Sequence, residues 1–423
     1  MEIKMSLFEE LKRRNLIKDC SNESELIHKL NYNTVNFYCG FDPTAISLTI
    51  GHLVQINTIL LLYNKGHTPF ILIGQATSLV GDPKETKERN LLIPQEVVKN
   101  TQEITMQLKS LLPRQRVYFV NNYDWLSQIN FLDFLRQYGK FFNIKYILSK
   151  KIISERLNNE SAGISYTEFS YSLLQALDFY QLYLKNNIIL QIGGSDQWGN
   201  ITSGLELIRK LINPTQCKPL GMSIPLLLND QGVKIGKSEK GNIWLNSELT
   251  SPYEMYQYFL NLPDSRVILF LKQMTLITLD RINYLASELK LNPQKRLAQK
   301  ELSRYIVSLV HGELVSKDCE KVSYLLFSKK RLDLAESDLK FLKKYLFCVS
   351  VNDDITLLDA LLKGKIAYSK KEARSLLLSR SIKIFPNFQD INDSLHLTPL
   401  VALFRKYILV TKKNNFNILI YFS

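Results

Sequence analysis

The stretch Tyr38-Cys39-Gly40-Phe41-Asp42-Pro43-Thr44-Ala45-Ile46-Ser47-Leu48-Thr49-Ile50-Gly51-His52 decides the fold of this chain. It continues a strand-like run over 34–39 and passes into apolar residues at helical spacing: Leu53, Ile56, Ile59, Leu60 and Tyr63. The N-terminus of such a helix attracts anions. Gly51 lets a nucleotide approach the backbone, and His52 is placed to donate to phosphate or ribose oxygens. The stretch therefore predicts a phosphate-binding turn between a strand and a helix.

A second motif, Lys234-Ile235-Gly236-Lys237-Ser238, follows the turn-forming residues 229–232. We call it the lysine loop, and its charge suits a polyphosphate. Each motif alone has an ordinary structural explanation, because a Gly-His pair often just opens a helix and a Lys-x-x-Lys run is usually a solvated face. The two motifs in this order favour an enzyme that activates its substrate with a nucleotide.

Strand-like and helical runs alternate from about residue 34 to 228. Strands are expected over 34–39, 70–73 and 188–192 and near 222–227, with helices starting at Gly51, Tyr171 and Gln197. This alternation predicts an α/β fold with a doubly wound parallel sheet of the Rossmann type. Ligands of such folds bind beyond the carboxyl ends of the strands, which is where the motif residues fall.

The chain divides by pattern into three expected domains. The first, over 1–248, is the α/β domain and includes an aromatic-rich insertion at about 121–170. The second, over 249–345, has helical periodicity throughout. The third, over 355–423, is a small α+β module that follows a polar link.

Composition bounds the class of protein. The 423 residues carry a net charge of +14, which favours a polyanionic partner. Five cysteines without a Cys-x-x-Cys pair indicate neither a disulfide framework nor a zinc site, and we expect no protein-bound metal. The charged N-terminus over 1–15 is unlike a signal sequence, and no apolar run approaches the roughly 18 residues that span a bilayer. A cytoplasmic protein without a membrane partner is expected.

Four stretches together resemble the class I aminoacyl-tRNA synthetases and, within that class, the tyrosyl-tRNA synthetases of bacterial type. They are 38–53, Gly81-Asp82-Pro83, 171–179 and the run Gln191-Ile192-Gly193-Gly194-Ser195-Asp196-Gln197-Trp198-Gly199-Asn200. The resemblance covers nearly the whole chain. It implies ATP with Mg²⁺ as a substrate, L-tyrosine and tRNA as partners, and a homodimer formed through the insertion. It also implies that the helical domain contacts the anticodon arm.

Activation joins the tyrosine carboxylate to the α-phosphorus of ATP and releases pyrophosphate, so the protein supplies positioning and charge. By resemblance, the catalytic residues are Thr44, Thr49, His52, Lys234, Lys237 and Ser238. Those around ATP are Cys39, Gly51, His52, Gly194, Asp196 and Lys237. Thr49 stands where the family usually has a histidine, which predicts a slower activation step.

The resemblance also implies a tyrosine pocket. Tyr38 and Asp178 contact the phenol oxygen, Asp82, Tyr171 and Gln175 surround the ammonium, and Gln197 reaches the carboxyl side. The spacing i, i+4 and i+7 of Tyr171, Gln175 and Asp178 places these three on one helix face. Without the flanking motifs, the tyrosine and the aspartate would be read as a half-buried aromatic residue and a surface acid.

The third domain resembles a ribosomal-protein-type RNA-binding module. Its basic helix face, with Lys370, Lys371 and Arg374, suits phosphates. Two alternatives remain open at this point. A tryptophanyl synthetase would show similar motifs, and an RNA-binding relative with weakened catalysis would explain Thr49.

Overall fold

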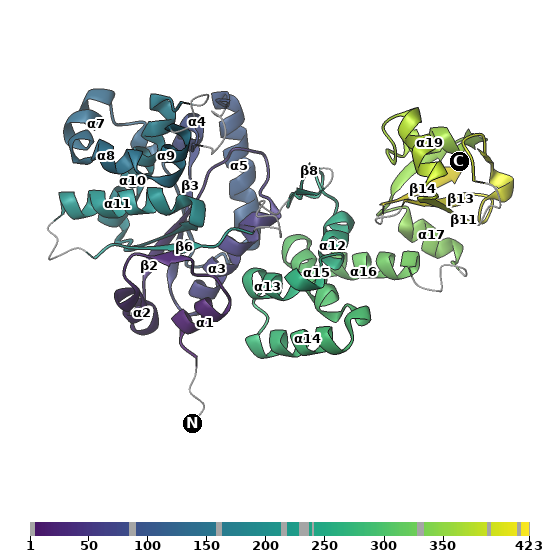
Figure 1. Cartoon of the computed structure of the whole chain (residues 1–423), viewed down its shortest axis with the longest axis horizontal. Coiled ribbons are helices and arrows are strands. Elements are labelled where there is room, and N and C mark those ends of the chain that lie inside the picture. Colours follow the sequence, from purple (N-terminus) through teal and green to yellow (C-terminus); the bar gives the residue numbers. More distant parts are fainter. Residues whose placement is uncertain are drawn as a thin grey trace. The chain divides into compact units, whose positions relative to one another are not determined.

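The computed structural model in Figure 1 describes residues 5–83, 90–157, 163–212, 218–227, 237–238, 241–327, 334–386, 391–412 and 416–422. The chain forms two compact units. One comprises Met1–Thr250 and Leu262–Leu302, and the other comprises Ser251–Asn261 and Ser303–Ser423. Each unit is described separately below. The division into three domains expected from the sequence stays a prediction.

A six-stranded sheet forms the centre of the first unit. Its strands are β1 (Asp19–Cys20), β2 (Asn36–Phe41), β3 (Thr68–Ile73), β4 (Tyr118–Asn121), β5 (Leu190–Gly194) and β6 (Leu220–Ile224). Their order is β1-β6-β5-β2-β3-β4, and every pairing is parallel except that of β1 with β6. The chain thus runs outward from β2 to β4 and then returns to β5 on the other side. This confirms the doubly wound fold and puts the switch point between β2 and β5.

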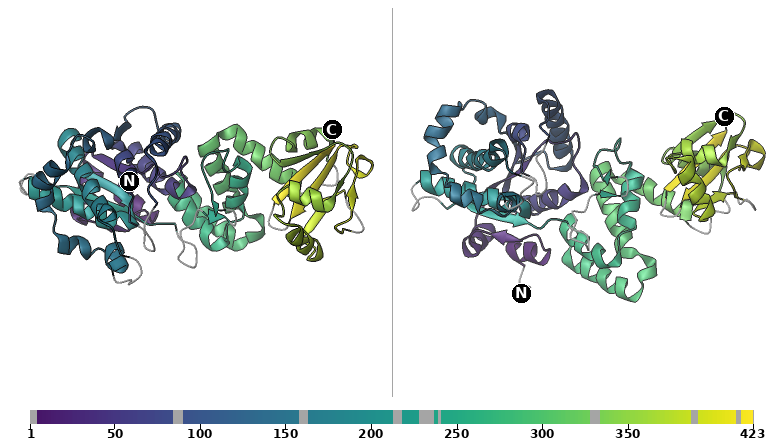
Figure 2. Two further views of the ribbon diagram at one scale, coloured as in Figure 1. Left: turned by 90° about the horizontal axis from the view of Figure 1, so that it is seen from above. Right: turned by 45° about the horizontal axis from the view of Figure 1, so that its top comes forward.

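Helices cover both faces of this sheet (Figure 2). They are α1 (Leu7–Arg13), α2 (Glu23–Tyr32), η1 (Ile50–His52), α3 (Leu53–Asn64), α4 (Gln75–Val80), α5 (Pro94–Leu111), α10 (Tyr166–Asn186), η3 (Ser195–Gln197) and α11 (Trp198–Leu211). Nearly every residue of α3 is buried, including Asn57 and Thr58. A helix that is apolar on all sides belongs inside the protein, so α3 holds the helix-start motif rigidly against the sheet.

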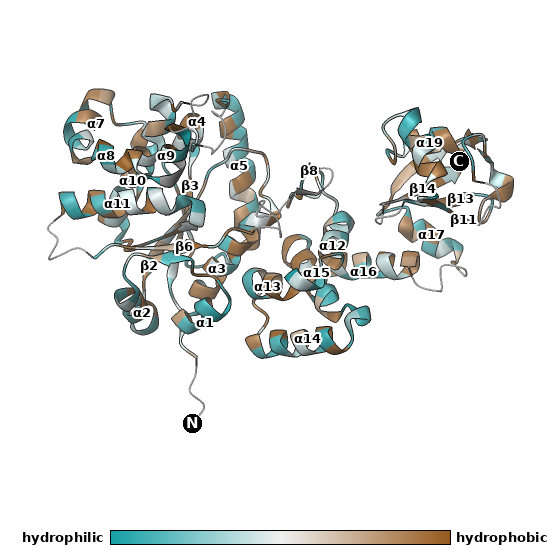
Figure 3. Ribbon diagram, in the orientation of Figure 1, coloured by the Kyte–Doolittle hydropathy of each residue, from teal (hydrophilic) through white to brown (hydrophobic). Residues whose placement is uncertain are grey.

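The insertion between β4 and α10 consists of short helices. These are α6 (Tyr123–Leu126), α7 (Phe131–Gln137), η2 (Gly139–Phe141), α8 (Ile144–Leu148) and α9 (Lys151–Leu157). A fully buried ion pair between Arg156 and Glu168, 3.0 Å apart, ties α9 to α10. Hydrophobic residues mark α7 in Figure 3. In α7, Phe131 is exposed by 62% and Leu132 by 75%, and in α8, Ile144 is exposed by 65%. Exposed apolar side chains in one short segment are typical of an interaction surface.

The first unit also contains α13 (Asp264–Met274), α14 (Leu279–Leu291), η4 (Pro293–Lys295) and the start of α15 (Leu297–His311). Arg14, at the end of α1, is only 2% exposed and caps the C-terminal end of α13. Its guanidinium donates to the carbonyls of Lys272, Thr275 and Ile277 at 3.4, 3.0 and 2.9 Å and to Glu10 at 3.1 Å. These carbonyls would otherwise lack helix partners.

We expect Arg14→Ala to lower the free energy of unfolding by about 3–5 kcal/mol, because it leaves buried carbonyls and Glu10 without their donor. The thermal midpoint should fall by roughly 5–10 °C. The matched control is Arg13→Ala, which removes an exposed arginine paired with Glu9 and should change the midpoint by no more than about 1 °C. Equal midpoints for the two variants would contradict this capping role.

The second unit begins with helices and ends with an α+β module. The helices are α12 (Pro252–Leu260), the end of α15, α16 (Glu313–Phe327) and α17 (Glu336–Leu342). The module contains β9 (Phe347–Val351), β10 (Ile355–Thr356), α18 (Leu357–Lys363), α19 (Lys370–Leu378), β11 (Ile382–Phe385), β12 (His396–Leu397), η6 (Pro399–Val401), β13 (Tyr407–Lys412) and β14 (Phe416–Phe422). Ser251 and Glu254 form a capping box at the start of α12, where Pro252 occupies the first turn.

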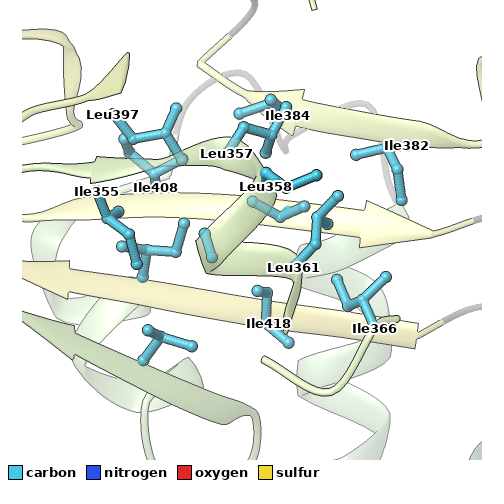
Figure 4. Packing of buried hydrophobic residues seen from close by; sticks show 14 of the residues in the cluster. Ile355, Leu357, Leu358, Leu361, Ile366, Ile382, Ile384, Leu397, Ile408 and Ile418 are labelled. Atoms are coloured by element: carbon cyan, nitrogen blue, oxygen red, sulfur yellow. The ribbon is translucent and has the colours of Figure 1, made fainter. Parts of the chain in front are cut away.

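The module's main sheet has the order β11-β13-β14-β9, with β14 parallel to β9. Its core is almost entirely aliphatic and includes Leu357, Leu361, Ile408 and Ile418 (Figure 4). All buried members of this cluster lie between residues 349 and 422. The module therefore packs around its own core. None of the helices in the described ranges combines the length and hydropathy needed to cross a membrane.

Candidate active site

The candidate site lies where the carboxyl ends of β2, β3, β4 and β5 meet. Parallel strands bring the residues that follow them to one edge of the sheet. The helix-start motif follows β2, α4 follows β3, Asn122 follows β4, and Gly194 ends β5. The helix α10 adds a face with Tyr171, Gln175 and Asp178.

Asp178 is 1% exposed and accepts two hydrogen bonds. Asn122 Nδ2 donates to Oδ2 at 3.1 Å, and Trp125 Nε1 donates to Oδ1 at 2.8 Å. Burial raises the pKa of Asp178 to about 8, although the two donors oppose the shift. An ionised Asp178 can accept a hydrogen bond from a phenol, and a protonated one can donate to the phenol oxygen. Either state suits the partner expected from the sequence.

Tyr38 lies on β2 beside this carboxyl group, with its ring 5.4 Å from that of Phe179. Its hydroxyl is buried and has no hydrogen-bond partner within the described residues. Burial, followed by the charge of Asp178, raises the pKa of Tyr38 well above its ordinary value, so the phenol stays protonated. An unpaired buried hydroxyl is costly. A ligand oxygen placed between Tyr38 and Asp178 would remove that cost.

Asp82 forms a second acidic centre. Its carboxylate accepts from Gln197 Nε2 at 2.8 Å and from Asn200 Nδ2 at 3.2 Å. Burial raises the pKa of Asp82 to about 6, with the nearby charges of Asp42 and Asp196 adding to the rise. Gln197, which was expected to reach the carboxyl side of the amino acid, thus holds Asp82 in place. The centre is suited to a cation such as an ammonium.

Asp42 joins Tyr171 to α4, the helix that follows β3. Tyr171 Oη donates to Asp42 Oδ2 at 2.7 Å, and Thr77 Oγ1 donates to Asp42 Oδ1 at 2.9 Å. Gly74 makes room for this contact, because a Cβ there would lie 1.9 Å from Asp42 Oδ1. Nearby on α10, the buried Gln175 Oε1 has no partner in the described part of the chain. A ligand donor could satisfy it.

The raised pKa of Asp82 predicts a pH dependence. Free tyrosine keeps its ammonium and carboxylate charges between pH 5 and 8. A loss of affinity for tyrosine near pH 6 would therefore come from a titrating group of the protein. Below about pH 6 Asp82 gains a proton, so its attraction for the ammonium expected at this position would fall. We expect kcat/KM for tyrosine to drop by about tenfold per pH unit there. In Asp82→Asn this drop should be absent, and an unchanged drop in the variant would assign the titration elsewhere.

The helix-start motif places His52 at the third position after the cap residue Thr49. The Thr49 backbone N–H, which can only donate, lies 3.0 Å from His52 Nδ1, and Thr49 Oγ1 lies 3.2 Å from it. Nδ1 is therefore an acceptor, and the proton resides on Nε2. Burial lowers the pKa of His52, which favours the neutral ring. His52 thus carries an N–H at Nε2 that can donate to a ligand.

The other residues expected around the nucleotide lie at the same edge. Gly51 is in η1, Cys39 is buried in β2, and Thr44 is exposed in the loop after β2. Burial raises the pKa of Cys39 to about 12, so it remains a thiol. A Cβ at Gly194 would lie 2.5 Å from Asp196 Oδ1, so a side chain there would displace the Asp196 carboxylate.

Part of the lysine loop lies outside the described residues, including Lys234. For Lys237 and Ser238 the backbone is described, as β7 (Lys237–Ser238), which pairs with β8 (Gly241–Asn242). On the module, Lys370 and Lys371 are exposed at the start of α19. Arg374 donates to Asp393 at 2.9 Å on the surface.

Sequence reasoning missed Asp42, Asn122, Trp125 and Asn200 as parts of the site. Asn122 immediately follows a strand, so the strand-end rule would have indicated it had β4 been expected. Asp42 follows β2 within the quoted stretch, and Asn200 lies within the quoted run that follows β5. No local signal marks Trp125, whose indole contact depends on α6 packing near α10.

Comparison with known proteins identifies the family. Residues 31–328 match the family described as tRNA synthetases class I (W and Y). The tyrosine–tRNA ligase of Onion yellows phytoplasma is 52% identical over 419 residues, covering 99% of this chain and 100% of that one. The tyrosine–tRNA ligase of Streptococcus pyogenes serotype M18 is 42% identical, covering 90% of this chain and 91% of that one.

A solved structure agrees with these sequence relatives. The C-terminally truncated mitochondrial tyrosyl-tRNA synthetase of Aspergillus nidulans superimposes with a TM-score of 0.70 at 30% identity, over 77% of this chain and 95% of that chain. The alternation of strands, the two motifs and the acidic pocket all accord with this likeness. The chain belongs to the class I aminoacyl-tRNA synthetases and, within them, to the tyrosyl-tRNA synthetases of bacterial type.

Proposed function

We propose that this enzyme is a tyrosine–tRNA ligase that activates L-tyrosine with ATP and transfers it to the 3′-terminal adenosine of its tRNA. The observation that carries the substrate choice is the pair of Tyr38, with its unpaired buried hydroxyl, and Asp178. This pair suits a phenol oxygen. Asp82, Tyr171 and Gln175 would surround the substrate ammonium.

In the proposed reaction, a carboxylate oxygen of tyrosine attacks the α-phosphorus and the bond to the β-phosphate oxygen breaks, releasing pyrophosphate. No protein nucleophile is needed, and the protein lowers the barrier by orientation and charge. His52 would donate from Nε2 to the nucleotide, Asp196 would accept from the ribose hydroxyls, and Gly51 and Gly194 would let ATP approach. Lys234, Lys237 and Ser238 would stabilise the leaving pyrophosphate.

Mg²⁺ would enter with ATP, as a partner of the phosphate oxygens. Within the described ranges, no three His, Cys, Asp or Glu side chains are grouped so as to hold a metal. Magnesium commonly keeps phosphate and water ligands and needs few protein carboxylates. Mg²⁺ would thus be part of the substrate, bound to the phosphates of ATP. We also propose that the enzyme works in the cytoplasm, where tRNA is charged.

The test is tyrosine-dependent exchange of labelled pyrophosphate into ATP. We expect exchange that requires tyrosine and magnesium-ATP. Equal exchange with tryptophan would favour a tryptophanyl enzyme instead. No exchange with any amino acid, by folded protein, would favour an RNA-binding relative without catalysis.

We propose that the insertion forms a homodimer contact. The exposed apolar residues of α7, α8 and α10 support this, including Phe131, Leu132, Ile144 and Tyr166. Sedimentation should give twice the chain mass. Charged residues at Phe131 and Leu132 should lower that mass to one chain.

The module around β9–β14 is proposed to bind tRNA through Lys370, Lys371 and Arg374. A chain ending at Leu346 removes this module and leaves the candidate active site, so it should still form tyrosyl-adenylate. Transfer to tRNA should fall sharply, and the salt dependence of tRNA binding should flatten by about one unit of log–log slope for each lost phosphate contact. Full charging with an unchanged salt slope would contradict this role.

A further inference from the structure

The loop between β2 and η1 is fastened to α5 by the side-chain amide of Gln107. Gln107 Oε1 accepts from the Leu48 backbone N–H at 3.0 Å, and Nε2 donates to the Ile46 carbonyl at 3.3 Å. Oε1 also lies 3.2 Å from Ser47 Oγ, whose single proton is shared between Oε1 and the Leu48 carbonyl. One amide thus contacts polar groups of three consecutive residues. They end immediately before the cap residue Thr49, and His52 follows within one turn.

The same loop is also bonded to the segment that follows the lysine loop. Ile50 N donates to Ile243 O at 3.1 Å, and Leu245 N donates to Leu48 O at 2.8 Å, with Thr49 bridged to Trp244. The β7–β8 hairpin, whose first residue is Lys237, ends at Asn242, directly before this ladder. The backbones that carry His52 and Lys237 therefore share one short antiparallel support.

Ser47 is the point where Gln107 reaches this support. Ser47 is 3% exposed, and its hydroxyl lies 3.2 Å from Gln107 Oε1 and 2.9 Å from the Leu48 carbonyl. Ser47 Oγ also accepts a hydrogen bond from the Asn246 backbone N–H at 3.1 Å. Contacts therefore run from Gln107 on α5 through Ser47 to the backbone of Asn246, the residue after the paired segment 243–245.

We propose that Gln107, acting through Ser47, is a positioning residue that sets the spacing between the helix-start motif and the β7–β8 pair, which begins at Lys237, during adenylate formation. The inference rests on the proposed function, because it assigns the two motifs to opposite ends of ATP. Gln107 touches neither reactant. Its influence would appear in the activation step, since displacements of about 1 Å in a reacting arrangement can cost roughly 100-fold in rate.

The principal test is Gln107→Met, which keeps the length of the side chain but removes the amide. We expect adenylate formation at saturating tyrosine to slow by about 10- to 100-fold, with the dissociation constant for tyrosine unchanged within about twofold. Gln107→Glu retains acceptors for Leu48 and Ser47 and should recover most of the rate. The matched control is Gln102→Met, on an exposed turn of the same helix, which should behave as the unmodified enzyme.

A double-mutant cycle with Lys237→Ala separates positioning from general destabilisation. In the Lys237→Ala background, Gln107→Met should slow the step by no more than about threefold, because the lysine that it helps to place is gone. Additive losses, a parallel loss of tyrosine affinity or an unchanged rate would each overturn the inference. If Gln107→Met proves unfolded by circular dichroism, Ser47→Ala is used in the same cycle with the same expectations.

Failure of this inference is distinguishable from failure of the proposed function. If the unmodified enzyme shows no tyrosine-dependent pyrophosphate exchange, the proposed function fails, and the inference fails with it. If the unmodified enzyme exchanges and Gln107→Met exchanges equally fast, only the inference fails.

Discussion

Asp178→Ala is expected to lower kcat/KM for tyrosine in pyrophosphate exchange by about 100- to 1000-fold, because it removes the proposed hydrogen-bond partner of the phenol and leaves two buried donors without an acceptor. Phenylalanine has no phenol oxygen, so its much weaker activation should fall by a smaller factor. The ratio of the two kcat/KM values should therefore shrink by at least about tenfold. This change in ratio is the specific result, since general damage would affect both substrates.

A milder variant provides a second test in case Asp178→Ala does not fold. Trp125→Phe keeps the aromatic ring and removes only the N–H that donates to Asp178 at 2.8 Å. It should lower kcat/KM for tyrosine by roughly tenfold, in line with the loss of one buried hydrogen bond. If both variants reduce tyrosine and phenylalanine activation equally, Asp178 does not recognise the phenol.

Lys237→Ala is expected to slow adenylate formation by about 100- to 1000-fold, a typical cost of removing one electrostatic contact made in the transition state. Tyrosine affinity should remain within about twofold, because in the proposed role the charge of Lys237 acts only as pyrophosphate leaves. Stopped-flow measurement at saturating ATP separates the two quantities. The matched control is Lys218→Ala, which removes another lysine, 68% exposed and placed just before the amino end of β6, whereas the candidate site lies at the carboxyl ends of the strands.

An unchanged rate in Lys237→Ala would show that the lysine loop does not act on the leaving group. A large loss of tyrosine affinity would assign Lys237 to substrate binding. Either outcome would contradict the proposed role.

The strands that could be predicted from the sequence are those with unbroken apolar runs. β2, β3, β5 and β6 lie within about two residues of the expected positions at most of their ends. β1 was not expected because it has two residues, too few for any period. β4 was not expected because its polar end, Asn121, merges with the insertion that follows. Its place in the sheet comes from pairing with β3, which local sequence does not encode.

In the candidate site, too, features that depend on local sequence could be predicted, and features that depend on tertiary pairing could not. Helical spacing alone predicts that Tyr171, Gln175 and Asp178 share a face, and α10 carries all three. The partners that orient them come from other elements: Asp42 follows β2, and Asn122 follows β4. Such contacts depend on which strands are neighbours. The order β5-β2-β3-β4 is a tertiary property. The sequence therefore predicted side chains proposed to bind the ligand, but it did not predict the side chains, such as Asp42 and Asn122, that orient them.

The position of β14 has a consequence for how the protein is made. β14 (Phe416–Phe422) is an interior strand, between β13 and β9, and it is also the last strand of the module in chain order. β9 is synthesised some seventy residues earlier, and within this sheet its only described neighbour is β14. During translation, β9 must therefore wait unpaired until Phe422 has left the ribosome. A nascent chain interrupted between these two strands would expose an open strand edge to other chains.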